Sequence, residues 1–186
     1  MQTYIRELIW HLPAAVDADL SAVVQSDVLG ELPPEVTPVV RRPTAGWRRA
    51  MAAARSPGPA DLVHGLDLDL PWRRRSLNVT TVHDLTVFDA PWALPRHRVI
   101  AERRLYTMAM RRAHVIIAVS AFTAQRVKDL FGRDPVVIPE APRSDLSVAD
   151  TAAIERVRRR YSLPERFVLH VGNIEPRKDV RGLAQA

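Results

Sequence analysis

The run at residues 114–120, HVIIAVS, places apolar side chains at consecutive positions rather than at alternate ones. A strand of this kind is buried on both faces, which is typical of parallel sheets covered by helices. Segments with helical spacing separate it from other short β-rich runs, and this alternation predicts an α/β chain with a doubly wound parallel sheet. The other predicted strands lie at 20–25, 36–40, 61–65, 77–84 and 135–139. The predicted helices lie at 2–12, 44–55, 96–113 and 121–131.

Three residues set the expected ends of these helices. Pro13 has no amide hydrogen and is expected to end the first helix. Thr44 is a suitable N-cap for the second helix. Gly132 is expected to end the helix at 121–131, because glycine readily takes the left-handed backbone conformation of a helix C-cap.

Polar residues cluster where the predicted strands end. In a parallel sheet the ligand site lies at the carboxyl ends of the strands. This rule selects His64 with Gly65, His83 with Asp84, Ser120 and Glu140 as the residues that face a cleft. A carboxylate at Glu140 can face a substrate hydroxyl or cap a helix, and we favour the structural role.

The alternation of strands and helices stops after the strand at 135–139. Residues 1–143 are predicted to form one α/β domain, and residues 144–165 a connector with a short basic helix at about 150–161. Residues 166–186 begin a second α/β unit with a buried strand at 167–173. We find no internal repeat of solenoid length.

The segment FVLHVGNIEPRKDV at 167–180 carries the most specific pattern of the chain. A strand leads through Gly172 to a helix start that bears Arg177 and Lys178. Backbone amides at a helix start, with cations beside them, can bind a diphosphate. The alternative is that both cations are ordinary solvated charges. No dinucleotide-binding or P-loop glycine pattern is present.

Composition narrows the function classes. The chain has 186 residues, no cysteine and a net charge of +6. Basic charge can attract nucleic acid, anionic lipid or phosphorylated substrates, but a coding bias towards Arg, Ala and Pro explains it equally well. No apolar run reaches the about 18–20 residues that span a bilayer, and the N-terminus does not resemble a signal peptide. No Asp/His group has metal-ligand spacing, so we expect no metal.

Four ordered motifs now point to a family. TVHDL at 81–85, AVSAFT at 118–123, VIPEAP at 137–142 and the segment at 167–180 resemble the motifs of family 4 retaining glycosyltransferases. The resemblance covers most of the chain from about residue 61 onward. It implies the GT-B fold, in which 1–143 would be the acceptor-side, Rossmann-like domain and 166–186 the start of a donor-binding, Rossmann-like domain.

The resemblance also implies roles for individual residues. Lys178 and Arg177 match the basic pair that holds the donor diphosphate, and Gly172 the turn before it. His83 matches the histidine of the family's H-D motif near the transferred sugar, and Asp84 follows it and fixes its loop. The resemblance implies that both residues are catalytic. Ser120, Glu140 and His64 would line the acceptor side.

The chain departs from the family pattern at individual residues and in whole segments. Asn173 stands where many members have Arg, and Glu140 stands where many have Asn. The family's first strand, with its glycine-rich loop, and its E-x7-E motif have no counterpart in these residues. We therefore expect this chain to be inactive by itself.

The implied activity is transfer of a sugar, mannose or a related hexose, from a nucleotide-sugar to an acceptor hydroxyl with retention. The expected partners are the donor and a glycan or lipid-linked acceptor, without nucleic acid or a cofactor, in the cytoplasm. A basic strip on the helix at 96–113 suggests contact with anionic lipid on the inner face of the membrane; a solvated arginine face is the alternative. Two other hypotheses are a non-catalytic α/β binding or scaffold module and a basic nucleic-acid-binding protein. The second lacks any recognition motif.

Overall fold

The structure is a computed structural model that describes residues 2–41, 58–71 and 76–185. The predicted helix at 44–55, with its cap Thr44, lies outside the described residues. The helices are α1 (Gln2–Ala15), α3 (Thr86–Asp89), α4 (Arg96–Arg112), α5 (Ala121–Phe131), α6 (Thr151–Tyr161) and α7 (Val180–Gln185). The strands are β1 (Ser21–Gln25), β2 (Thr37–Arg41), β3 (Leu62–Gly65), β4 (Leu77–Val82), β5 (Val115–Ala118) and β6 (Val136–Val137). Short 3-10 helices are η1 (Ser26–Glu31), η2 (Pro91–Ala93) and η3 (Pro176–Lys178).

Four of the strands form one parallel sheet in the order β3-β4-β5-β6. Each strand pairs with the next along the chain, with α3, η2 and α4 between β4 and β5 and α5 between β5 and β6. Parallel neighbours need such crossover connections, because a strand must return to its starting edge before it can pair. The predicted α/β class and parallel sheet are confirmed.

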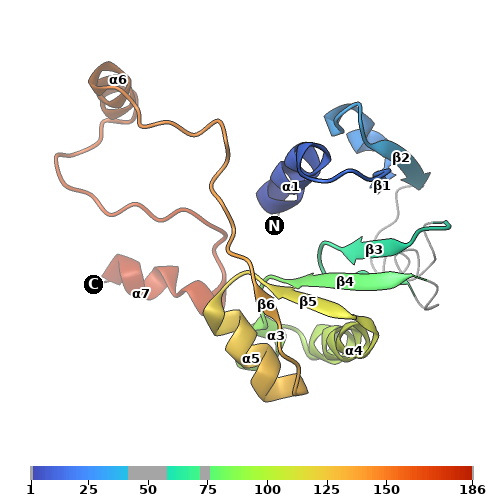
Figure 1. The fold of residues 1–186 in the computed structure, drawn as a ribbon. Coiled ribbons are helices and arrows are strands. Elements are labelled where there is room, and N and C mark those ends of the chain that lie inside the picture. The colour runs from blue at the N-terminus through green and yellow to red at the C-terminus, as the bar shows by residue number, and fades with distance from the viewer. Residues whose placement is uncertain (1, 42–57, 72–75, 186) are drawn as a thin grey trace.

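The first two strands form a separate sheet. Among the described strands, β1 pairs only with β2, in parallel, over five residue pairs from Ser21↔Thr37 to Gln25↔Arg41. In Figure 1 these strands and α1 lie on the opposite side of the four-stranded sheet from α3, α4 and α5. The sequence pattern located both strands but did not show that they pair apart from the others.

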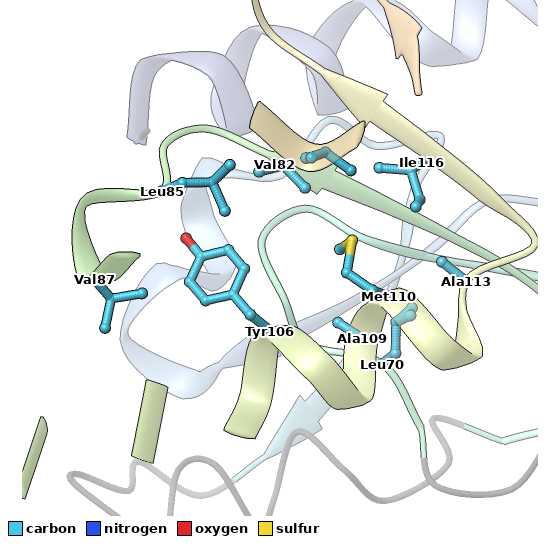
Figure 2. Close-up of a cluster of buried hydrophobic side chains, with 10 residues drawn as sticks. Leu70, Val82, Leu85, Val87, Tyr106, Ala109, Met110, Ala113 and Ile116 are labelled. Atoms are coloured by element: carbon cyan, nitrogen blue, oxygen red, sulfur yellow. The ribbon is translucent and has the colours of Figure 1, made fainter. Parts of the chain in front are cut away.

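The hydrophobic core lies between the sheet and the helices that follow β4 and β5. Val82 and Ile116 from the strands pack against Tyr106 and Met110 of α4 and Val127 of α5, and Figure 2 shows the strand and α4 members of this cluster. The opposite face of β4 meets α1, because the Tyr4 hydroxyl lies 3.2 Å from Thr81 Oγ1. Elements thus cover both faces of the central strand, as a doubly wound sheet requires.

The predicted helix ends are correct at one position and wrong at another. Gly132 caps α5 in the left-handed conformation, with φ 63°. Pro13 does not end α1, which continues to Ala15. Proline prevents one hydrogen bond to the preceding turn, and a helix that stops two residues later loses little by it.

The predicted strand at 167–173 does not form. These residues have no regular structure, and Val168, Leu169 and Val171 are each more than 70% exposed. A strand needs a neighbour for its hydrogen bonds, and no described strand lies beside this segment. The connector helix forms as α6, capped by the Asp150 carboxylate on the Ala153 amide at 2.6 Å. The domain boundaries at 143 and 166 stay predictions.

Candidate functional site at the carboxyl edge of the sheet

Two of the predicted site residues lie side by side at one edge of the sheet. β4 and β5 are parallel neighbours, and Val82, the last residue of β4, pairs with Ala118, the last residue of β5. His83 directly follows β4, and Ser120 lies two residues beyond the end of β5. The predicted position of both residues, at the carboxyl ends of adjacent parallel strands, is confirmed.

The His83 ring is held by two acceptors. Its Nε2 lies 2.9 Å from the Leu66 carbonyl oxygen, and its Nδ1 lies 2.7 Å from Glu140 Oε1. The Tyr4 ring packs edge-on against it, with centroids 4.9 Å apart. The loop after β3, the segment after β6 and α1 therefore all meet at this histidine.

The hydrogen-bond chemistry of this pair is restricted. A carbonyl oxygen can only accept, so Nε2 must donate to Leu66. One proton then lies between Nδ1 and the Glu140 carboxylate, and the two side chains together are neutral. The glutamate that the sequence interpretation favoured as a structural residue is thus the hydrogen-bond partner of the histidine.

Gly65 allows the loop after β3 to approach this edge. A Cβ atom built on Gly65 would lie 2.6 Å from the Asp69 carbonyl oxygen, closer than real Cβ contacts come. Thr80 Oγ1 donates to the Asp67 carbonyl at 2.7 Å, and so ties the same loop to β4. Any side chain larger than hydrogen at Gly65 would displace the loop that carries the Leu66 carbonyl.

Asp67 is a site neighbour that sequence reasoning missed. Burial raises the pKa of its carboxyl group, Asp69 raises it further, and the nearby His83 opposes the shift. The available signal was the acidic run LDLDL directly after the end of β3, at the sheet edge where ligands bind.

Asp84 fixes the loop that follows His83. Its Oδ1 accepts from the Thr86 amide at 2.9 Å, and its backbone carbonyl accepts from the Tyr106 hydroxyl at 2.6 Å. Burial is the main cause of the strongly raised pKa of Tyr106, whose hydroxyl therefore stays protonated and donates. These two contacts hold the loop in place, and the expected catalytic role of Asp84 stays a prediction.

Ser120 and His64 are both engaged in local structure. Ser120 Oγ accepts from the Thr123 amide at 3.0 Å and caps α5. His64 Nε2 lies 2.9 Å from Thr81 Oγ1, and burial lowers the pKa of its ring. A place for either side chain on an acceptor side stays a prediction.

The predicted diphosphate residues follow in a turn and a 3-10 helix. Gly172 has φ 152°, a conformation that favours glycine. Arg177 Nε pairs with Glu175 Oε2 at 2.8 Å. Lys178 is exposed and forms no ion pair with a described residue. The Glu102 carboxylate is the main cause of the raised pKa of Arg98, and the charges of Glu175 and Asp84 raise it further.

Within the described part of the chain, no three His, Asp or Glu side chains are grouped so that they could hold a metal ion. No helix there is long and apolar enough to cross a membrane.

Comparison with known proteins decides which family this architecture belongs to. The family described as Glycosyltransferase Family 4 matches residues 1–141, from α1 to just beyond Glu140. The chain belongs to glycosyltransferase family 4. The matched region of this family 4 chain contains His83, Asp84, Ser120 and Glu140, and ends before the predicted diphosphate residues.

One curated relative of this family 4 chain is the O-antigen chain mannosyltransferase B of Escherichia coli. The two are 33% identical over 129 residues, which cover 67% of this chain and 34% of the relative. The alignment thus spans about a third of the relative's length. No solved structure matches the chain.

Proposed function

We propose that this chain forms the acceptor side of a glycosyltransferase that moves a hexose from a nucleotide-sugar to an acceptor hydroxyl, with retention of configuration. Family membership supports the reaction class. The observation that carries the proposal is the His83–Glu140 pair at the carboxyl ends of β4 and β6, where ligands of parallel sheets bind.

The donor would bind through its diphosphate. Gly172, Arg177 and Lys178 would hold it, since cations and backbone amides stabilise the charge that develops on a leaving diphosphate. The charge of Glu175, two residues before Arg177, contributes to the raised pKa of Arg98 in α4, and this supports a donor position on the same side as α4. No metal or cofactor is needed in this scheme.

Mannose is the first sugar to test, because the E. coli relative is named a mannosyltransferase. The acceptor would be a glycan or a lipid-linked glycan, and the chain alone would be inactive.

A lipid-linked acceptor would place the protein on the cytoplasmic face of a membrane. Arg96, Ile100, Arg104 and Arg111 lie on one side of α4, and Ile100 is 55% exposed. Binding to anionic vesicles that falls with salt, and is lost when Arg96 and Arg104 become Gln, would support this contact. Equal binding to neutral vesicles would contradict it.

The test of the proposed function is a transfer assay on the full-length gene product. It would be incubated with GDP-mannose, other nucleotide-hexoses and octyl hexosides, and the products analysed by mass spectrometry and by NMR of the anomeric proton. We expect transfer with the anomeric configuration of the donor. Absence of any transfer, or an inverted product, would contradict the proposal.

A further inference from the structure

The two members of the His83–Glu140 pair differ in what they offer to a substrate. The His83 side chain is 10% exposed, whereas that of Glu140 is 42% exposed. Of this pair, the carboxylate and not the imidazole is therefore the group presented to solvent.

The hydrogen-bonding capacity of each group leads to the same conclusion. An imidazole ring can form two in-plane hydrogen bonds, and His83 uses one on Leu66 and the other on Glu140. A carboxylate has about four lone-pair positions, and the ring occupies one of them. Of these two side chains, Glu140 is therefore the one that can still accept a hydrogen bond from a hydroxyl group.

Charge makes this arrangement suitable for a hydroxyl. The imidazole beside Glu140 shares a proton with it, which stabilises a partly desolvated carboxylate that accepts from a neutral group. The Leu66 carbonyl and the Tyr4 ring fix the plane of the imidazole and thereby the direction of the carboxylate. Asp67 and Asp84 lie nearby and would repel a second anion.

We infer that Glu140 is the residue that contacts the acceptor, by accepting a hydrogen bond from its sugar hydroxyl, and that His83 is a positioning residue that orients Glu140. This inference rests on the proposed function. It adopts for Glu140 the substrate-facing alternative that the sequence interpretation did not favour, and it gives His83 a positioning role in place of the expected catalytic one.

The first test is independent of activity. Ring N–H signals of His83 would be recorded by 15N-edited NMR in the 186-residue chain and in Glu140→Gln. We expect two hydrogen-bonded ring N–H signals in the wild type and loss of the Nδ1 signal in the variant, with the Nε2 signal retained. Unchanged signals in Glu140→Gln would overturn the pair. Glu155→Gln, which removes an exposed charge in α6, is the matched control and should leave both signals in place.

The second test separates the roles in the full-length gene product, with the octyl hexoside from the transfer assay. Glu140→Gln should raise the KM for the hexoside about tenfold or more, with the Kd for nucleoside diphosphate within about twofold of wild type. His83→Asn should have a similar effect, and the double variant should be no worse than either single one, because both remove the same contact.

Two outcomes distinguish the failures. If the wild type transfers sugar but Glu140→Gln leaves the KM for the hexoside unchanged, while His83→Asn raises it, then the ring contacts the acceptor and this inference is wrong. If the wild type transfers no sugar, the proposed function itself fails. Glu140→Asp keeps the charge but shortens the side chain, and should fall between wild type and Glu140→Gln; its folding can be checked by the same NMR spectra.

Discussion

His83 Nδ1 and Glu140 Oε1 lie 2.7 Å apart, although 57 positions separate the two residues in the chain. The contact joins the end of β4 to the segment after β6 and so passes across the end of β5, which lies between them in the sheet. It fixes the edge of the sheet where the family resemblance places the acceptor.

Gly65 should be intolerant of any side chain. Alanine would place Cβ 2.6 Å from the Asp69 carbonyl oxygen, and relief of such an overlap costs about 1–3 kcal/mol. We expect Gly65→Ala to lower the free energy of unfolding in urea by that amount and to shift the His83 ring signals. Gly30→Ala is the control, because no atom lies within 4 Å of a Cβ there. Equal stability of both variants would show that the loop does not pack as described.

Tyr106 should anchor the loop that carries Asp84. Tyr106→Phe removes the 2.6 Å hydrogen bond to the Asp84 carbonyl but keeps the ring in the core. Figure 2 shows the Tyr106 ring among the core side chains. We expect a loss of about 0.5–1.5 kcal/mol in unfolding free energy, with backbone shifts concentrated at residues 83–86. Tyr161→Phe changes a ring that is 63% exposed and should be neutral. Shifts spread evenly over the chain would argue against an anchor.

His64 should make the fold weaker in acid. Burial lowers the pKa of its ring below the ordinary 6.5, so the unfolded chain binds this proton more readily than the folded one. The contribution of neutral His64 to the free energy of unfolding is fully present above pH 6.5. It is lost as the pH falls through the lower pKa that His64 has in the folded protein. Urea unfolding at pH 7.5 and at pH 5.5 should show this loss, and His64→Gln should reduce it. An identical pH dependence in the variant would assign the effect to other groups.

Lys178 should act on the donor alone. Losing one charge-assisted contact to a phosphate weakens binding by about tenfold to a hundredfold. Calorimetry with nucleoside diphosphate on the full-length gene product should show this for Lys178→Ala. The control is Lys128→Ala. Lys128 lies in α5 and pairs with Asp134 in the loop that follows, so this variant should bind nucleoside diphosphate as the wild type does. Indifference to Lys178→Ala would mean that the diphosphate binds elsewhere.

The sequence was sufficient for the elements that depend on local patterns. HVIIAVS predicts β5 because its consecutive apolar residues suit a strand with both faces covered, and Gly132 predicts the end of α5 because few residues adopt its backbone conformation. The positions of His83 and Ser120 follow from the rule that parallel strands end at a common edge.

Contacts between distant segments could not be predicted in this way. The periodicity at 167–173 indicates a buried strand, but pairing depends on a neighbour that local pattern cannot supply. The partner of Glu140 was equally hidden, because it depends on how the segment after β6 crosses the edge of the sheet. The position of Asp67 near His83 depends on the close packing of the loop after β3 against Gly65, and no spacing rule in the sequence describes that packing.

The most direct test of the acceptor-side assignment is the effect of His83→Ala on kcat/KM for the hexoside acceptor, measured in the full-length gene product at saturating nucleotide-sugar. The account predicts a fall of about tenfold or more, with the Kd for nucleoside diphosphate within about twofold of wild type. Wild-type kcat/KM in His83→Ala would contradict it, since the edge built around this histidine would then take no part in sugar transfer.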